Sequence, residues 1–412
     1  MKVLLIGSGG REHALALALK QDPAVTELHI GPGNPGMATL GTLHPINLEN
    51  ISIIALAESV HPDLVVIGPE LPLVNGVADD LRAAGFAVFG PSRAAAQLEG
   101  SKEFAKQVMV AAGVPTARSF YCTTASEVES ALDTFGAPYV VKHDGLAAGK
   151  GVVVTSDREA AIAHAALSNS VVIEEYLDGP EVSLFGISDG RTIIAMQPAQ
   201  DFKRAYDNDE GANTGGMGAY SPLPWAPSDI CEQTLEKVLL PTIREMGKRG
   251  EPFVGLLYAG LALTSRGLKV IEFNVRFGDP ETEVLLPRLK TPLAQLLLRA
   301  ATGSLTPDEQ LDWSDESAVT VVLASEGYPA APKTGGEITG IPSDALVFHA
   351  GTRLDDGTLR SSGGRVLTVT GLGASLAAAR DSAYAAIEQI SLAGSHFRRD
   401  IAAKAANDES GK

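Results

Sequence analysis

The segment VIEFNVRFGDPETE, residues 270–283, is an apolar, β-branched run that ends among charged side chains. Such a run predicts a strand, and alternation along a strand places Glu272 and Asn274 on one face. A carboxylate and an amide oxygen on one face are typical ligands of a hard cation. A strand with one polar face would contain the same two residues without any metal, so this pair alone leaves both interpretations open.

Charged side chains crowd the end of the same predicted strand. They are Arg276, Asp279, Glu281 and Glu283. A purely structural strand would finish in turn residues at this point. The cluster therefore favours a functional site where the strand ends.

A glycine-rich segment with two lysines, KHDGLAAGKGV at residues 142–152, follows an apolar strand over 139–141. Lys142 comes directly after that strand, and Gly145, Gly149 and Gly151 surround Lys150. Glycines let backbone N–H groups close on phosphate oxygens, and ammonium groups neutralise the phosphate charge. It is not a Walker A loop, because the glycine spacing is too short and Gly151 replaces the serine or threonine that binds magnesium. The pattern favours a phosphate loop over a plain glycine-rich hairpin.

The segment VVIEEYLDGPEVS, residues 171–183, predicts a strand that runs into a short acidic linker. The backbone between Glu174 and Leu177 can offer a carbonyl and an amide to an adenine edge, and a carboxylate such as Glu181 can hold ribose hydroxyls. Taken alone, the segment is better explained as a solvated acidic turn.

Residues 1–90 alternate apolar runs with helical patterns, which predicts an open parallel sheet with helices on both faces. Strands are predicted over 3–6, 28–30, 64–67 and 87–89, and helices over 12–20, 52–59 and 77–84. The loops after the strands are rich in glycine and proline, and they would line the carboxyl edge of the sheet, where ligands of such folds bind. Two features weigh against a dinucleotide site: Glu12 replaces the third glycine, and no acid follows the second strand. Phosphate binding in another form and a tight structural turn both remain open for the first loop.

The rest of the chain divides at turn-rich segments. Gly90 to Ser92 mark a seam, followed by helical patterns over 93–99 and 102–112. A compact α+β unit is predicted over 115–187, and mixed strands and helices continue to about residue 325. The last part predicts short strands over 346–350 and 365–370 and an alanine-rich helix over 374–392.

Composition limits the class of protein. The chain has 412 residues, enough for two to four domains, and a formal charge of −17 that argues against a nucleic-acid partner. No run reaches the roughly 18 apolar residues of a membrane helix, and the N-terminal MKVLLI is too short for a signal-peptide core. Two cysteines are too few for a disulfide framework or a structural zinc site. We expect a cytoplasmic protein without membrane or nucleic-acid partners.

Together the motifs resemble those of the ATP-grasp ligases, and most closely the phosphoribosylamine–glycine ligase family of purine biosynthesis. The similarity covers nearly the whole chain, through long motifs in a fixed order: GSGGREHA, GPGNPG, GPELPLVNG, SKEFAK, KHDGLAAGKGV, EEYLDGPEVS, QDFKRAYDNDEGANTGGMGAYSP, EFNVRFGDPETE, HAGT, GGRVLTVTG and HFRRDIAAKA. It implies an α/β chain with a Rossmann-like N-terminal substrate domain (1–100), an ATP-grasp domain (101–325) with a lid over 115–187, and a small β-rich C-terminal domain (326–412). A monomer is expected.

The resemblance implies ATP and magnesium, or manganese in its place, as cofactors. It assigns Lys102 and Lys142 to the ATP phosphates, the loop around Gly149, Lys150 and Gly151 to a phosphate cover, Glu174 and Leu177 to the adenine hinge, Glu181 to ribose, and Glu272 and Asn274 to the metal. Substrate-facing segments would contain Gly9, Gly10, Asn34, Pro35, Asp207, Thr214, Gly215, Gly216, Arg276, Asp279 and Glu281. Lys142, Arg276 and Asp279 are the expected catalytic residues, and Asp201, Lys203 and Arg204 are further candidates that an exposed ion cluster explains equally.

The chain departs from the family pattern at a few positions. His143 replaces the usual alanine, Phe202 the usual histidine and Ala212 the usual proline, and Ala331-Pro332 differ from the usual residues before Lys333. The strand before Glu272, predicted over 258–262, lacks the acid that many ATP-grasp ligases carry there. A second metal ion would therefore have few protein ligands.

The implied reaction activates the carboxylate of glycine with ATP and joins it to the amine of phosphoribosylamine. The products would be glycinamide ribonucleotide, ADP and phosphate, formed through a glycyl phosphate. Another carboxylate–amine ligase on the same scaffold remains an alternative, which would differ in the 201–220 segment. A dehydrogenase-like nucleotide-binding module is a second alternative, and the missing ribose acid weighs against it.

Overall fold

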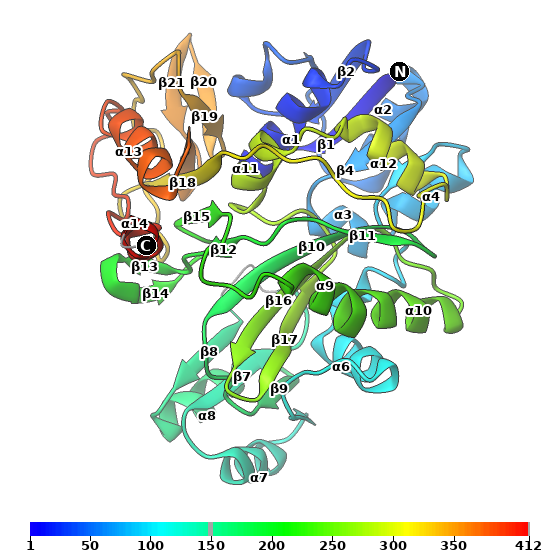
Figure 1. Cartoon of the computed structure of the whole chain (residues 1–412), viewed down its shortest axis with the longest axis vertical. Coiled ribbons are helices and arrows are strands. Elements are labelled where there is room, and N and C mark those ends of the chain that lie inside the picture. Colours follow the sequence, from blue (N-terminus) through cyan, green and yellow to red (C-terminus); the bar gives the residue numbers. More distant parts are fainter. Residues whose placement is uncertain (147–150, 411–412) are drawn as a thin grey trace.

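The N-terminal part of the computed structural model, which describes residues 1–146 and 151–410, is a five-stranded parallel sheet (Figure 1). Its strand order is β3-β2-β1-β4-β5. The strands are β1 (Lys2–Gly7), β2 (Glu27–Pro32), β3 (Thr42–Leu43), β4 (Leu64–Ile67) and β5 (Val88–Phe89). The neighbouring strands β1 and β4 are almost wholly buried, as strands covered on both faces must be. The open parallel sheet predicted from the alternating pattern is confirmed.

Helices and glycine-rich loops surround this sheet. The helices are α1 (Gly10–Gln21), η1 (Pro35–Met37), α2 (Asn50–Val60), α3 (Glu70–Val74), α4 (Val77–Ala83), α5 (Gln97–Gly100) and α6 (Lys102–Ala112). The helix predicted over 93–99 is wrong in extent: 93–96 form a turn and α5 begins at Gln97. The loops after β1 and β2 meet at the carboxyl edge, where the Gly33 amide donates to the Gly7 carbonyl at 3.0 Å.

A small antiparallel sheet, which we call the lid sheet, projects from the body (Figure 1). Its order is β6-β9-β7-β8. It contains β6 (Ser119–Cys122), β7 (Tyr139–His143), β8 (Val152–Thr155) and β9 (Val171–Glu174), and it packs on α7 (Ala125–Phe135) and α8 (Arg158–Ala165). Val141, Ile173 and Leu132 belong to a core of its own. The sequence grouped residues up to 187 with this unit, but the lid sheet ends at Glu174 and the next strand pairs elsewhere.

That next strand belongs to a central antiparallel sheet of order β11-β10-β16-β17. The strands are β10 (Glu181–Asp189), β11 (Ile193–Ala195), β16 (Val254–Thr264) and β17 (Gly267–Asn274), with α9 (Ile230–Thr234), η3 (Leu235–Leu239) and α10 (Leu240–Lys248) beside them. The strand predicted around Glu272 is confirmed as β17.

A third sheet joins segments that are far apart in sequence, in the order β12-β15-β18-β22-β19. Its strands are β12 (Gln200–Asp201), β15 (Gly218–Ser221), β18 (Ser317–Ala324), β19 (Leu346–His349) and β22 (Arg365–Gly373). Two hairpins flank it, β13–β14 (Arg204–Tyr206, Glu210–Asn213) and β20–β21 (Thr352–Asp355, Thr358–Ser361). The remaining helices are η2 (Asp207–Asp209), α11 (Thr282–Leu285), η4 (Leu286–Arg288), α12 (Leu293–Ala301), α13 (Leu376–Ile387) and α14 (Ala403–Ser410). The C-terminal strands thus extend a sheet that begins in the 200–221 segment.

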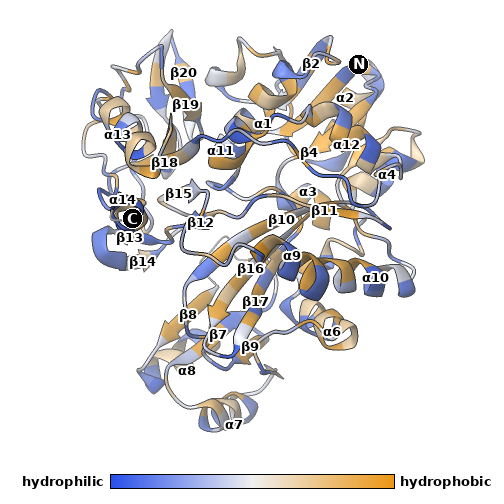
Figure 2. Ribbon diagram, viewed as in Figure 1, coloured by the Kyte–Doolittle hydropathy of each residue, from blue (hydrophilic) through white to orange (hydrophobic). Residues whose placement is uncertain are grey.

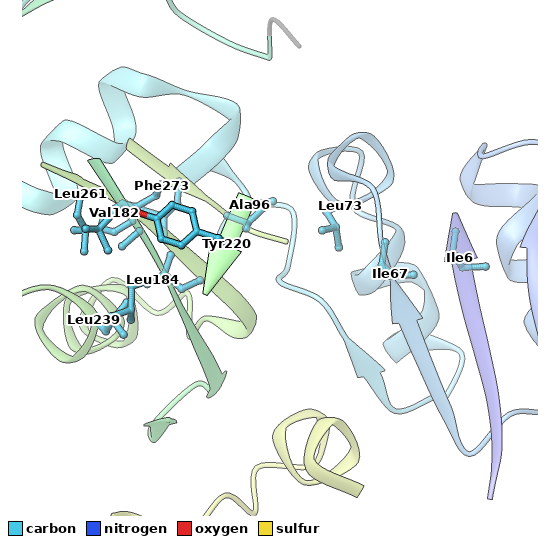
Figure 3. Close-up of a cluster of buried hydrophobic side chains, with 14 of the residues drawn as sticks. Ile6, Ile67, Leu73, Ala96, Val182, Leu184, Tyr220, Leu239, Leu261 and Phe273 are labelled. Atoms are coloured by element: carbon cyan, nitrogen blue, oxygen red, sulfur yellow. The ribbon is translucent and has the colours of Figure 1, made fainter. Parts of the chain in front are cut away.

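One apolar core runs from the N-terminal sheet into the central sheet. Figure 3 shows Ile6, Ile67 and Leu73 on the N-terminal side and Leu184 and Phe273 on the central strands, all in one cluster of buried residues. Apolar residues follow the sheet interiors, and polar residues the outer faces of helices such as α10 (Figure 2). In residues 1–146 and 151–410, no helix has both the length and the apolarity needed to cross a membrane.

Candidate active site

Glu272 and Asn274 lie on β17 and offer two oxygen donors to one side of the central sheet. No bulge separates them, since Glu272 pairs with Gly260 and Asn274 with Tyr258 on β16. Gly260 carries no side chain, and a Cβ there would make an ordinary contact of 3.4 Å with Glu272 Cγ. Across the described part of the chain, neither side chain is engaged by a hydrogen bond or a close ion pair. Two free oxygen donors fit a magnesium ion that takes its remaining ligands from phosphates and water.

Three lysines surround this pair of donors. Lys102, the first residue of α6, and Lys203 both feel the charge of Glu272, and Lys142 on β7 lies close enough to affect Lys102. Burial lowers the pKa of Lys102, and the Glu272 carboxylate opposes that effect. Such a cluster of ammonium groups around one carboxylate suits a polyphosphate with its cation.

A buried carboxylate, Glu174, lies between two lysines. Its oxygens accept from Lys142 at 2.9 Å and from Lys106 at 2.8 Å. Burial raises the pKa of this carboxyl, but the two ammonium groups outweigh burial and hold it below its usual value. Lys142 also donates to the Ile271 carbonyl at 2.9 Å, one residue before Glu272. The Glu174 side chain therefore fixes Lys142 beside the metal donors, which leaves only its backbone for the expected adenine hinge.

The expected hinge after β9 is anchored by Glu175. This carboxylate accepts from Lys269 at 2.7 Å and from Arg118 at 3.1 Å, and Arg266 lies 3.4 Å away. Burial alone would raise the pKa of Glu175, but these partners lower it to about 2. The linker that contains the half-buried Leu177 is thus tied to the β16–β17 hairpin.

The expected phosphate cover lies partly outside the described residues, which do not include Gly149 and Lys150. At its edges, Gly151 is buried, and its carbonyl accepts from the His143 amide at 2.7 Å and from His164 Nε2 at 3.2 Å. Asp144 accepts from the Lys102 amide at 2.7 Å and so joins β7 to the start of α6. His143 stacks on His164 with ring centroids 4.2 Å apart.

Arg276 lies between two carboxylates behind the site. Its Nη2 is 3.1 Å from Glu99 and its Nε 3.3 Å from Glu70. These charges raise its pKa above the usual arginine value, against the effect of burial. The two ion pairs hold the guanidinium in one orientation and partly neutralise its charge.

The loop Thr214–Gly215–Gly216 meets Asp279 through an arginine of the C-terminal strands. Arg365 on β22 lies 3.0 Å from the Asp279 carboxylate and donates to the Gly215 carbonyl at 2.6 Å. Gly216 has φ +111°, and a Cβ there would lie 2.4 Å from Pro280, so only glycine fits. Four of the expected substrate residues are therefore brought together, and the C-terminal strands close the site.

Glu281 is buried and held by neutral donors. Its Oε1 accepts from the Tyr258 hydroxyl at 2.6 Å and from the Ser183 hydroxyl at 3.1 Å. Asp201, nearby, has its pKa raised to about 7 by burial, with Glu281 and Glu181 adding to the rise and Lys203 opposing it. Lys203 pairs with Glu181, the expected ribose ligand, and lies 3.8 Å from Asp201. Glu181 is therefore already ion-paired before a nucleotide binds.

The N-terminal loops meet the same region. Gly9 and Gly10 start α1, and the Gly9 amide donates to Glu12 at 2.6 Å. The side chain of Asn34 donates to the Ser8 and His349 carbonyls at 2.9 and 2.7 Å, so it joins the first loop to the C-terminal domain. Pro35 begins η1 directly after it. Asn34 thus shapes the loops through its side chain, which is 5% exposed.

The side chains of Asp207 and Phe202 contact the C-terminal segment. Asp207 accepts from the Arg399 amide at 2.7 Å, so its carboxylate contacts the C-terminal segment. Phe202 packs under Arg398, whose Cζ lies 4.9 Å from the ring centroid, and beside Tyr220. The ring at position 202 therefore supports the C-terminal segment.

Sequence reasoning did not single out Lys106 and Arg365. Lys106 lies one helical turn after Lys102 in SKEFAK, and this i, i+4 spacing was a usable signal. Arg365 lies in GGRVLTVTG, where nothing in the local pattern indicates its partners 86 and 150 residues away.

Comparison with protein families gives three matches, in chain order, to the domains of one family. The phosphoribosylglycinamide synthetase N domain matches residues 1–99, the ATP-grasp (A) domain residues 100–282 and the C domain residues 318–404. The chain is 61% identical to the phosphoribosylamine–glycine ligase of Streptomyces coelicolor, over 98% of this chain and 100% of that protein. It is 55% identical to the enzyme of the same name from Mycobacterium leprae, over 98% and 99%.

Solved structures agree. The crystal structure of phosphoribosylamine–glycine ligase from Thermotoga maritima has a TM-score of 0.84 and 36% identity, over 97% of this chain and 100% of that one. The biotin carboxylase domain of Hydrogenobacter thermophilus 2-oxoglutarate carboxylase has a TM-score of 0.73 at 17% identity, over 96% and 91%, and shares the fold alone.

We expect Lys106→Met to raise the KM for ATP by about tenfold or more, because Glu174 would then pull Lys142 away from the phosphates with no second cation to balance it. Steady-state kinetics measures this, with the exposed Lys248→Met as control. Lys106→Arg should restore most of the affinity. An unchanged KM in Lys106→Met would contradict the positioning role.

We expect Asp201 to make stability depend on pH. Its folded pKa of about 7 lies above its unfolded value, so the folded state binds the proton more tightly and loses stability as pH rises from about 4 to 7. The difference in thermal midpoint between wild type and Asp201→Asn should therefore fall across this range and level off above it. Calorimetry from pH 5 to 8 tests this; a constant difference would contradict it.

Proposed function

Since the chain belongs to the phosphoribosylglycinamide synthetase family, we propose that it joins glycine to phosphoribosylamine through a glycyl phosphate, giving glycinamide ribonucleotide, ADP and phosphate. The phosphoribosylamine–glycine ligase activity itself, a step of purine biosynthesis, follows from family membership, and the ATP-grasp domain implies the use of ATP. The proposed reaction through a glycyl phosphate rests on one observation, the group of Lys102, Lys142 and Lys203 around Glu272.

ATP would bind between the lid sheet and the central sheet. Lys102 and Lys142 would contact its phosphates, together with the loop that contains Gly149, Lys150 and Gly151. The backbone of Glu174 and Leu177 would hold the adenine, and Glu181 the ribose. Lys203 would exchange part of its pairing with Glu181 for a phosphate oxygen, because its ammonium also interacts with the charge of Glu272.

Glu272 and Asn274 would hold magnesium, or manganese in its place. Their free oxygens support this, and Gly260, which pairs with Glu272, adds no side-chain ligand, so phosphates and water would complete the coordination. When bound, the cation would offset the charge of the phosphoryl group during transfer. Within the described residues, no three histidine, cysteine or acidic side chains converge on a common point that could hold a metal.

The substrate side would lie where Arg276, Asp279, Glu281 and the Thr214–Gly216 loop meet the N-terminal loops. Arg276 would orient the carboxylate of glycine with its planar fork, held in place by Glu70 and Glu99. Asp279 would bind the amine of phosphoribosylamine, since Arg365, 3.0 Å away, holds its carboxylate in place. Gly9, Gly10, Asn34 and Pro35 would receive the phosphoribosyl group at the start of α1, where backbone N–H groups suit a phosphate. Asp207 is retained as a more distant substrate contact.

No side-chain nucleophile is needed for the reaction. The carboxylate of glycine attacks the γ-phosphoryl group of ATP and displaces ADP. The amine then attacks the acyl carbon, loses a proton and displaces phosphate. The lysines lower the barrier by positioning and by charge stabilisation, and exclusion of water would protect the intermediate. Lys142, Arg276 and Asp279 are the residues proposed to act at the reacting groups.

We also propose that the protein is monomeric and cytoplasmic. The proposed domains are residues 1–100, 101–325 and 326–412, and the second contains the lid sheet, whose last strand ends at Glu174. Analytical ultracentrifugation tests the oligomeric state.

We expect Glu272→Ala to raise the magnesium concentration needed for half-maximal activity by at least about tenfold, since changes even in outer-shell partners commonly cost about 10- to 100-fold in metal affinity. A magnesium titration of ADP release measures this. The exposed Glu236→Ala serves as the control. Unchanged magnesium dependence would exclude Glu272 as a ligand.

Hydroxylamine should trap glycyl hydroxamate when ATP and glycine are present without phosphoribosylamine, because an acyl phosphate reacts with it directly. Lys142→Met should form almost none while remaining folded. Release of AMP and pyrophosphate in place of ADP and phosphate would refute the mechanism. A screen of other acids and amines, coupled to ADP release, separates this reaction from that of another carboxylate–amine ligase on the same scaffold.

A further inference from the structure

A second pocket of about 400 Å³ lies outside the candidate active site and shares none of its residues. Four segments form it: Gln197 and Pro198, the proline-rich loop from Pro222 into α9, Arg288 at the end of η4, and Trp313 to Asp315. The volume is within the range of small-molecule sites. The ligase reaction described above does not use it.

Arg288 is a buried cation in this pocket without an acidic partner. It is 3% exposed and donates to the Ser221 hydroxyl at 2.7 Å and to the carbonyls of Glu316 and Ser314. Nowhere in residues 1–146 and 151–410 does a carboxylate lie within ion-pair distance of it. Burial alone lowers its pKa, to about 10. Buried charges are normally paired, and a guanidinium has five N–H donors, so Arg288 retains capacity for an oxyanion.

The rest of the lining is mixed in character. Gln197 Oε1 is buried and has no hydrogen-bond donor, so it can accept one from a ligand. The Trp313 ring centroid lies 6.0 Å from Arg288 Cζ, and Pro198, Pro222 and Leu223 add apolar walls. Asp315 is an exposed acid of the lining and disfavours a multiply charged anion.

We propose that this pocket binds a small organic oxyanion, a carboxylate or a phosphate, that also carries a hydrogen-bond donor and a flat apolar part. The oxyanion pairs with Arg288, because the planar guanidinium matches the geometry of a carboxylate or phosphate. The donor satisfies Gln197 Oε1, and the flat part lies against Trp313 and the prolines. This site is independent of the proposed mechanism of the ligase.

The test is calorimetric titration of the full-length chain with three probes. They are 4-hydroxybenzoate as the carboxylate, 4-aminophenyl phosphate as the phosphate, and 4-hydroxybenzamide as the uncharged control. We expect saturable binding of at least one anion and none of the amide. Binding by only one anion identifies the ligand class. No binding of either anion, or equal binding of the amide, overturns the proposal.

Fluorescence locates the site. The chain has two tryptophans, so Trp225→Phe leaves Trp313 as the only indole, and its emission should change along the same titration curve. An unchanged emission on anion binding would place the anion elsewhere and overturn the assignment.

Variants test the contacts. Arg288→Met should weaken anion binding by about tenfold or more, and the exposed Arg244→Met of α10 should leave it unchanged. Because Arg288 also joins two loops, Gln197→Leu is a second probe that leaves those bonds intact; it should weaken binding of both hydroxyl- and amino-bearing anions severalfold. The proposal would be overturned if Gln197→Leu bound the anion with full affinity and a folded variant at Arg288, either Arg288→Met or Arg288→Lys, did so too.

Discussion

The nucleotide side of this protein depends on one buried carboxylate held between two lysines. Removing Glu174, Lys106 and Lys142 from water costs several kcal/mol per ion, which only close pairing and further hydrogen bonds can offset. That pairing joins α6, β7 and β9, and the bond from Lys142 to Ile271 extends it to β17. This charge cluster therefore positions the residues expected to contact the phosphates, the adenine and the metal, because each is close in sequence to a member of the cluster. Lys102 lies one turn before Lys106, Leu177 follows Glu174, and Glu272 follows Ile271.

Two other cations of the site each lie between two carboxylates. Arg276 lies between Glu70 and Glu99, and Lys203 between Glu181 and Asp201. Such pairing orients each cation before a substrate arrives, which is how preorganised electrostatics lowers a barrier without movement at the moment of reaction. It also explains how a chain with a net charge of −17 can hold a polyphosphate. Screening confines surface potential to about 8 Å, so local placement outweighs net charge.

The C-terminal domain belongs to the site because it shares a sheet with the 200–221 segment. β18 pairs with β15 on one side and β22 on the other, and β22 carries Arg365 to Asp279. On the opposite side, the Asn34 side chain bonds the His349 carbonyl, so the N-terminal loops are fixed to the same domain. Phe202 strengthens this contact between the two segments by packing under Arg398.

The sequence determined the parallel N-terminal sheet, the strand that carries Glu272 and Asn274, and the lysine and glycine motifs, because strand alternation and local glycine spacing are properties of neighbouring residues. Long motifs in a fixed order determined the family for the same reason. The tertiary structure alone decided that the strand after the hinge leaves the lid for the central sheet, that Lys106 holds Glu174, and that Arg365 closes the site. It also placed Arg288 in a pocket without a counter-ion. These features depend on pairing and burial between segments far apart in the chain, and no local pattern encodes which distant carboxylate, carbonyl or strand a residue will meet.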